Sequence, residues 1–229
     1  MRALLPRAPP DPPDPSDRKK PHMTKILHIQ ASPRGVDSKS NTIARARIDT
    51  LRQHDPGLDV DTVDLWREPL PEFDGNSAAA KLTFFGVGDL DGAKRSAWDR
   101  IVEITERFKA ADHYVLGVPM WNGGIPYRLK LYIDILTQPG LLFGFDPAKG
   151  YFGLLNGKKA TVVYSSGVFA PGVSPDYGVD FQSSYLDWWL RFIGVADIQT
   201  IRYQPSLLSQ DPVRGLNDAI NAARKLAAA

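Results

Sequence analysis

Short apolar segments and amphipathic helical segments alternate along the chain, and this alternation constrains the fold more than any other feature. The segments HYVLGVP (113–119) and KKATVVYS (158–165) are apolar without the every-second-residue alternation of a half-buried strand. Helical periodicity is clearest in RSAWDRIVEITERFKAAD (95–112). Strands that are apolar on both faces, separated by helices, are typical of an α/β fold with a parallel sheet covered on both sides.

Five strands and five helices of the main pattern can be placed in this way. The expected strands are 25–31, 58–65, 113–119, 158–165 and 196–204, and the expected helices are 40–54, 95–112, 127–138, 181–194 and 210–227. Residues 66–90 are rich in Pro and Gly and are expected to be irregular. Short connections between five parallel strands favour a flavodoxin-like sheet of order 2-1-3-4-5. Ligands of such sheets bind beyond the carboxyl ends of the strands, so the loops after Ala31, Pro119 and Ser165 are the candidate site.

The first 22 residues differ in composition from the rest. They contain seven prolines, and the segment PPDPPDP predicts a disordered tail that leans toward polyproline II. Met23 begins MTKILHIQ, which resembles a natural amino terminus, so residues 1–22 are also explained by a misassigned start. We therefore expect a tail over 1–22 and one flavodoxin-like domain over 23–229.

Charge and residue usage exclude several classes of function. The tail holds five basic and three acidic residues, which leaves 23 of each over residues 23–229, and a nucleic-acid partner is not expected for such a balance. The absence of cysteine excludes thiolate catalysis and cysteine metal sites, and it fits a cytoplasmic protein. The four histidines are not spaced as metal ligands, so no metal site is expected. No segment reaches the ~18 apolar residues of a membrane-spanning helix.

The loop SPRGVDSKSN (32–41) suits a phosphate group. Ser32, Ser38 and Ser40 bring hydroxyls to the amino terminus of a predicted helix, where backbone N–H groups favour anions. The loop lacks the GxxxxGK[ST] and GxGxxG patterns, so neither a P-loop nor a dinucleotide fingerprint is implied. Taken alone, the loop is better explained as a serine-rich turn with a helix cap.

The two other loops suit the edges of a flat ring. In GVPMWNGGIP (117–126), Met120 and Trp121 offer apolar surface, Asn122 offers a donor and an acceptor, and the glycines permit close approach or a positive φ. A tryptophan that covers a core edge is the plainer alternative. The loop SSGVFAPGVSPDYG (165–178) places Gly167 just after a strand. No histidine follows His113, so a Ser–His–Asp triad has little support.

With these three loops, the sequence resembles the FMN-dependent NADH azoreductases, which are also grouped as NADH:quinone oxidoreductases. The resemblance runs from about Thr24 to the carboxyl terminus. Its motifs are a serine followed six residues later by SKSN, then PMWNGGIP with LKLYID, NGKKA, SSGV and FIGV. These correspond to the family patterns S-x-S-N, P-M-[YW]-N-F-x-I-P, L-K-x-Y-[IF]-D, TGKKA, S-R-G-G and FIGI.

The resemblance implies one bound FMN and a set of residues around it. The implied FMN contacts are Ser32, Ser38, Lys39, Ser40, Met120, Trp121, Asn122, Gly123, Ser165, Ser166, Gly167 and Val168. Two departures bear on substrate range. Gly123 stands where the family has Phe, which predicts a roomier pocket, and Ser166 and Val168 stand where it has Arg and Gly.

The implied reaction transfers two electrons from NADH, or alternatively NADPH, through FMN to a quinone or an azo compound by a ping-pong mechanism. The chemistry lies on FMN, so no catalytic side chain is required. The resemblance also implies a homodimer, with Phe145 and Phe192 lining the substrate side. The segment WWLRFIG is explained either as a dimer contact or as a buried helix. A flavodoxin-like electron carrier and a non-enzymatic binding module of the same fold are the alternatives.

Overall fold

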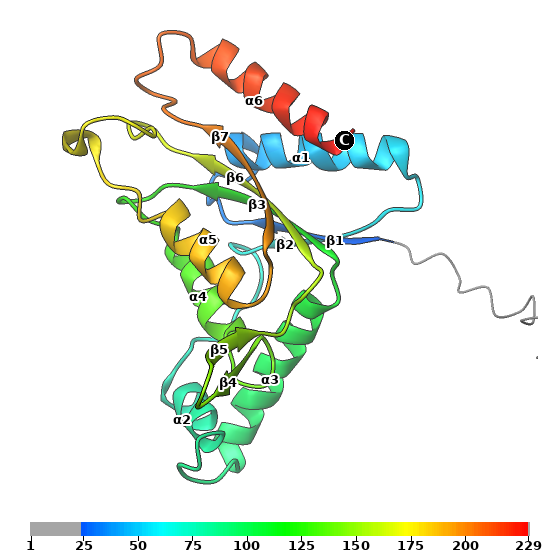
Figure 1. Ribbon diagram of the computed structural model, residues 1–229, viewed down its shortest axis with the longest axis vertical. Coiled ribbons are helices and arrows are strands. Elements are labelled where there is room, and N and C mark those ends of the chain that lie inside the picture. The colour runs from blue at the N-terminus through cyan, green and yellow to red at the C-terminus, as the bar shows by residue number, and fades with distance from the viewer. Residues whose placement is uncertain (1–23, 229) are drawn as a thin grey trace, which may run out of the picture.

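A five-stranded parallel sheet forms the central layer of the computed structural model, which describes residues 24–228 (Figure 1). Its strands are β1 (Lys25–Gln30), β2 (Asp59–Asp64), β3 (His113–Pro119), β6 (Lys159–Ser165) and β7 (Asp197–Tyr203). They follow the order β2-β1-β3-β6-β7, and all neighbouring pairs are parallel. The predicted order 2-1-3-4-5 is therefore confirmed, and the order reverses between β1 and β3.

Helices cover both faces of the sheet. The helices α1 (Lys39–His54) and α6 (Pro212–Ala227) lie on one face, and α3 (Gly92–Lys109), α4 (Tyr127–Leu136) and α5 (Ser183–Phe192) lie on the other (Figure 1). Consecutive residues of β3 alternate between two buried clusters. Val115 belongs to the cluster with Ile43 of α1, and Leu116 belongs to the cluster with Phe108 of α3. Both faces of the central strands are buried, which explains why these strands are apolar throughout.

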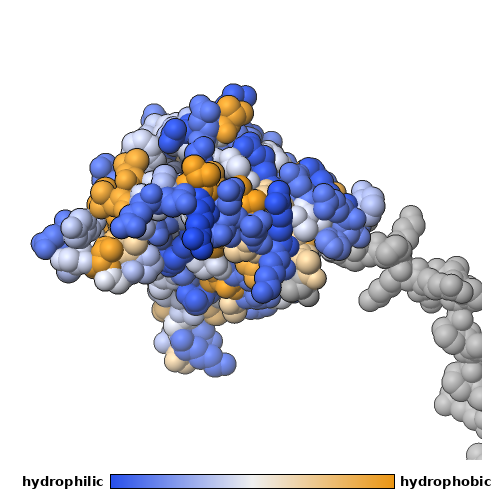
Figure 2. Space-filling model, turned by 90° about the horizontal axis from the view of Figure 1, so that it is seen from above, coloured by the Kyte–Doolittle hydropathy of each residue, from blue (hydrophilic) through white to orange (hydrophobic). Residues whose placement is uncertain are grey.

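The face that carries α1 and α6 is largely hydrophilic, with apolar residues in separate groups (Figure 2). On the inner side of these helices, Ile48 of α1 and Ala223 of α6 are buried in the same cluster. The amphipathic patterns of both segments thus have one side in the core and one side in solvent.

The prediction that residues 66–90 are irregular is wrong in part, because α2 (Gly75–Thr83) forms within them. The Asp74 side chain caps this helix by accepting a hydrogen bond from the Ser77 N–H at 2.9 Å. The structure also adds an antiparallel hairpin of β4 (Phe143–Asp146) and β5 (Gly150–Gly153). Within residues 24–228, two short 3₁₀ helices complete the elements, η2 (Gly35–Asp37) and η3 (Pro175–Tyr177).

The predicted disordered tail, residues 1–22, lies outside the described residues, and the domain boundary at Met23 stays a prediction. Within residues 24–228, no helix combines the length and apolar character needed to cross a membrane. The same part of the chain holds no group of three or more His, Asp or Glu side chains arranged to bind a metal ion.

Candidate functional site

The three predicted loops meet at the carboxyl edge of the sheet around a cavity of about 310 Å³, here called the polar cavity. Its lining residues are Ser32, Arg34, Ser38, Lys39, Pro119, Met120, Trp121, Ser165, Ser166, Gly167, Tyr203, Ser206 and Leu207. Eight of the twelve residues predicted to contact FMN are among them. The structure therefore brings together residues that lie more than a hundred positions apart in the sequence.

The first loop places hydroxyls at the amino terminus of α1. Ser38 is the N-cap of this helix, and its Oγ accepts a hydrogen bond from the Asn41 N–H at 3.3 Å. Ser40 does not line the cavity, because it is fully buried behind Ser38 with its Oγ 3.1 Å from the Ser38 Oγ. Ser32 accepts a hydrogen bond from the Arg34 N–H at 3.3 Å. Hydroxyls, the Lys39 cation and a helix amino terminus together form a donor set that suits a phosphate group.

The second loop is a tight turn whose geometry explains its Asn-Gly pair. The N–H groups of Trp121 and Gly124 each donate to the carbonyl oxygen of the other at 2.9 Å. Asn122 and Gly123 have φ values of 50° and 81°. Two successive positive φ values are the requirement of a type I′ turn, which favours Asn-Gly. Gly123 therefore serves the turn, and it does not line the polar cavity.

The third loop is tied to its neighbours on both sides. The Met120 N–H donates to the Ser165 carbonyl oxygen at 2.7 Å, which joins the second loop to the third. The Ser166 Oγ donates to the Phe169 carbonyl oxygen, so this hydroxyl stabilises its own loop. Val168 lies at the surface and does not line the polar cavity.

A fourth wall, which sequence reasoning missed, comes from the segment after β7. The Leu207 N–H donates to the Gly167 carbonyl oxygen at 2.8 Å, and the Ser206 N–H donates to the Ser166 carbonyl oxygen at 2.9 Å. A Cβ atom on Gly167 would lie 2.9 Å from Leu207 Cδ1, so a side chain at position 167 would displace the end of the exposed Leu207 side chain. Strand order could have predicted this wall. The carboxyl end of β7 lies beside that of β6, so the segment after β7 ends next to the third loop.

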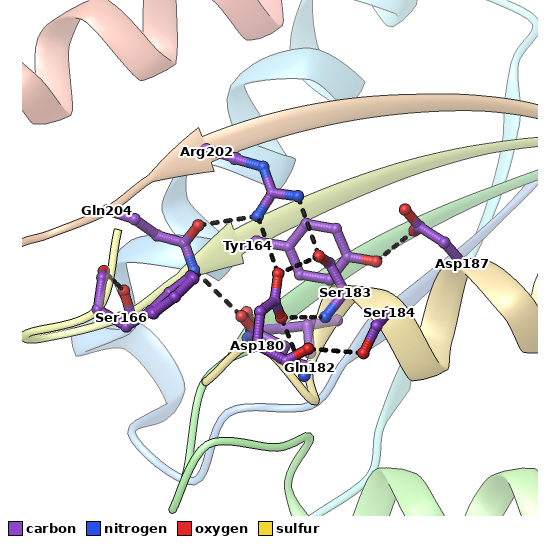
Figure 3. Close-up of polar contacts among 11 residues, drawn as sticks. Tyr164, Ser166, Asp180, Gln182, Ser183, Ser184, Asp187, Arg202 and Gln204 are labelled. Carbon is purple, nitrogen blue, oxygen red and sulfur yellow. Dashed lines mark hydrogen bonds and ion pairs between the residues drawn. The ribbon is translucent and has the colours of Figure 1, made fainter. Parts of the chain in front are cut away.

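A polar network joins the ends of β6 and β7 to the start of α5 (Figure 3). Arg202 of β7 donates to the Gln204 Oε1 at 3.0 Å and to the Ser183 Oγ at 3.0 Å, and it lies 3.8 Å from the Asp180 carboxylate. Its guanidinium also lies over the Tyr164 ring at 5.1 Å. Burial and the nearby Asp187 carboxylate raise the pKa of Tyr164, so its hydroxyl stays protonated and donates to Asp187 at 2.6 Å.

Beside the polar cavity lies a larger one of about 860 Å³, here called the aromatic cavity. Its lining residues are Pro33, Trp66, Trp121, Asn122, Gly124, Ile125, Pro126, Tyr127, Lys130, Phe181, Ser184, Tyr185 and Trp188. Trp121 lines both cavities and is 48% exposed, so it does not cover a core edge. Trp66 is fixed by a hydrogen bond from its Nε1 to the Ala31 carbonyl oxygen at 2.9 Å.

Comparison with known proteins identifies the family. A family model described as a flavodoxin-like fold matches residues 24–227. A protein of Ruegeria pomeroyi named FMN-dependent NADH:quinone oxidoreductase is 60% identical over 200 residues, which cover 87% of this chain and 98% of that protein. The chain belongs to the FMN-dependent NADH:quinone oxidoreductase family. A second member, from Desulfotalea psychrophila, is 44% identical over 185 residues, covering 81% of this chain and 87% of its own.

Solved structures agree with this family. A crystal structure of an azoreductase from Bacillus anthracis str. Sterne matches with a TM-score of 0.81 at 25% identity, covering 90% of this chain and 99% of that one. An FMN-dependent NADH-azoreductase from Bacillus anthracis str. Ames Ancestor, solved in complex with FMN, matches with a TM-score of 0.80 at 25% identity, covering 90% and 98%. The predicted resemblance to azoreductases and NADH:quinone oxidoreductases is confirmed.

In this family member, Phe145 and Phe192 line neither cavity within one chain. They belong to an aromatic surface cluster in which the Tyr151 ring lies 5.0 Å from Phe145 and 5.7 Å from Phe192. Trp188 joins this cluster to the aromatic cavity, because its ring stacks on Phe192 at 5.3 Å. Phe145 and Phe192 therefore stand apart from the walls of both cavities in the single chain.

The described histidines, His28, His54 and His113, line neither cavity. Burial, and then the positive charge of Arg45, lower the pKa of His28 to about 4. Burial, and then Arg47, lower the pKa of His113 to about 4. Both imidazoles are therefore neutral near pH 7, and neither stands beside a cavity serine as a general base.

Proposed function

We propose that this chain binds FMN in the polar cavity and transfers two electrons from NADH to quinones and azo compounds. The observation that carries the proposal is that the two cavities lie side by side and share Trp121 as a lining residue. One offers hydroxyls and a helix amino terminus, and the other offers aromatic walls. The names of the relatives, which specify FMN, NADH, quinone and azo reduction, support the same reading.

The lining residues of the polar cavity match the chemical groups of FMN, with donors for the phosphate and surfaces for the ring. Ser32, Ser38 and Lys39 would hold the phosphate at the amino terminus of α1, with Ser40 orienting the Ser38 hydroxyl from behind. Met120 and Trp121 would contact one edge of the ring, and Ser165 to Gly167 another. Gly167 leaves its part of that wall without a side chain, and Leu207 lies next to it.

Bound FMN would supply the hydride chemistry, and the chain would supply binding and orientation. The N–H groups of Met120 and Trp121 already donate to the Ser165 and Gly124 carbonyl oxygens, so stabilisation of negative charge on a bound ring would fall to other backbone N–H groups of these loops. The donor and the acceptor would occupy the aromatic cavity in turn, which gives a ping-pong mechanism. We propose NADH as the donor and NADPH as the alternative to be compared with it.

A homodimer is proposed from the apolar surface next to the aromatic cavity. Tyr151 and Phe152 of β5 and Trp188 of α5 are each at least half exposed, whereas Trp189 is buried. The WWLRFIG segment thus combines both alternatives, with one tryptophan in the core and one at the surface. The balance of 23 basic and 23 acidic residues in 23–229 supports the proposal of no nucleic-acid partner. The lack of cysteine is compatible with the cytoplasmic location that we propose.

The test is direct. The purified protein is expected to be yellow or to take up one FMN per chain, and to lose the flavin absorption on addition of NADH under anaerobic conditions. Addition of a quinone should restore the absorption. A protein that takes up no FMN would contradict the proposed function, and one that binds FMN but is not reduced by NADH would favour the electron-carrier alternative.

A further inference from the structure

Phe181 combines an exposed side chain with a backbone that is held from three sides. Its ring is 63% exposed and lines the aromatic cavity. Its own N–H donates to the Gly123 carbonyl oxygen at 3.0 Å, which links the long connection after β6 to the tight turn after β3. An isolated surface phenylalanine needs no explanation, but this one lies among Trp121, Tyr127 and Trp188.

The two residues that flank Phe181 fix its position (Figure 3). Asp180 caps α5, because its Oδ1 accepts hydrogen bonds from the N–H groups of Gln182 at 3.0 Å and Ser183 at 2.7 Å. Gln182 is fully buried, and its Nε2 donates to the Val118 carbonyl oxygen at 3.0 Å. Its Oε1 accepts a hydrogen bond from the Gln204 Nε2 at 3.1 Å. The backbone at Phe181 is thereby tied to the ends of both β3 and β7.

The Phe181 ring also occupies the space beside position 123. A Cβ atom on Gly123 would lie 3.6 Å from Phe181 Cδ2 and 3.3 Å from the Val179 carbonyl oxygen. The expectation that Gly123 leaves a roomier pocket is therefore not met at this point. With a φ of 81°, Gly123 is also poorly suited to any side chain. The aromatic surface at this side of the cavity comes from Phe181.

We propose that Phe181 determines which quinones this protein accepts, by stacking on the acceptor ring at the side of the aromatic cavity that faces the Gly123 turn. The proposal rests on the proposed function, since the acceptor is a quinone. A ring on a backbone that is already held in place contributes stacking at little cost in backbone conformational entropy. A two-ring quinone would depend on Phe181, whereas a three-ring quinone would gain additional contact from Trp121 and Trp188.

The experiment measures quinone binding without turnover. FMN-loaded protein is titrated with 1,4-naphthoquinone and with 9,10-anthraquinone-2-sulfonate in the absence of NADH, and binding is followed by quenching of tryptophan fluorescence. The variants are Phe181→Ala, the conservative Phe181→Tyr, and Tyr177→Ala as a control. Tyr177 is exposed in the same connection but lines neither cavity described above.

We expect Phe181→Ala to raise the Kd for naphthoquinone about tenfold, which corresponds to about 1.4 kcal/mol, and to change the anthraquinone Kd less than threefold. Phe181→Tyr and Tyr177→Ala should stay within twofold of the wild type for both quinones. Unchanged Kd values in Phe181→Ala, or equal changes for the two quinones, would overturn the proposal. Failure of the wild type to bind FMN would instead contradict the proposed function, and the proposal about Phe181 would fall with it.

Discussion

The two cavities that meet at Trp121 are built in different ways. The polar cavity is lined at its phosphate end by Ser32 and Ser38, which are buried and hydrogen-bonded within their own loop. The aromatic cavity is lined by rings such as Phe181 and Trp188, which are more than half exposed. A site whose donors are already fixed suits one resident group, and a site with exposed rings suits ligands that come and go.

The supports of the two cavities differ as well. Beneath the polar cavity, the Gln30 side chain lies between His28 and Asn41, at 3.5 Å from each, and so connects β1 with the first turn of α1. Beside the aromatic cavity, Gln182 connects α5 with the ends of β3 and β7. The difference suggests changes that affect one cavity and spare the other.

The largest expected effect comes from placing a negative charge in the polar cavity. Aspartate at position 38 can still cap α1, so Ser38→Asp should leave the fold intact. Its carboxylate would repel the FMN phosphate by about 4 kcal/mol for unit charges at ~4 Å and an effective dielectric constant of ~20, or about a thousandfold in Kd. Quenching of flavin fluorescence measures this Kd. Ser96→Asp, on the exposed side of α3, is the control and should bind FMN as the wild type does.

Acid should weaken the fold through the buried histidines, one of which, His28, lies 3.5 Å from the Gln30 side chain. The pKa of His28 and of His113 is about 4 in the folded chain and about 6.5 when unfolded. The unfolded state therefore binds more protons between these values, and stability is lost as the pH falls from about 6.5 to about 4. We expect a loss of about 2 kcal/mol per histidine between pH 7 and pH 5 in urea unfolding.

Gln53 at the exposed end of α1 provides the comparison for this pH dependence, because its side chain does not titrate. Gln53→Ala should leave the slope of stability against pH unchanged, and His28→Gln should reduce it. An equal slope in the wild type and both variants would contradict the role given to His28.

Loss of Gln182 should act on the aromatic cavity and spare the polar one. Gln182→Ala leaves the Val118 carbonyl oxygen and the Gln204 amide without their partner in a buried place, at a cost of about 2 kcal/mol in the free energy of unfolding. It should also weaken naphthoquinone binding more than FMN binding, because Phe181 loses its anchor. Gln53→Ala, exposed on α1, is the control. Equal weakening of FMN and naphthoquinone would contradict the separation of the two supports.

The smallest expected effect concerns Asn122 at the turn between the cavities. Asn122→Gly keeps the positive φ and removes only the amide, so FMN reduction by NADH should slow about five- to tenfold, or ~1 kcal/mol. Asn122→Ala adds backbone strain of about 1 kcal/mol. Urea unfolding should therefore separate the two variants, while their rates of flavin reduction stay alike. A large difference in rate between them would show that the turn, and not the amide, matters.

The sequence predicted the sheet because its central strands are buried on both faces and therefore continuously apolar. It predicted most of the polar cavity because loops after neighbouring parallel strands end at one edge. It did not predict α2, whose short run lies among Pro and Gly, or the hairpin, whose four-residue strands show no period. Hydrophobic periodicity carries no information about contacts between loops. It therefore could not predict the exposure of Val168, the turn geometry at Gly123 or the wall at Leu207.

The central claim is that FMN lies in the polar cavity while donor and acceptor use the aromatic cavity in turn. Initial rates measured over a grid of NADH and naphthoquinone concentrations test it most directly. One cavity used alternately predicts parallel lines in the double-reciprocal plot, with each substrate competing against the other at high concentration. Intersecting lines, which require both substrates to be bound together, would contradict it.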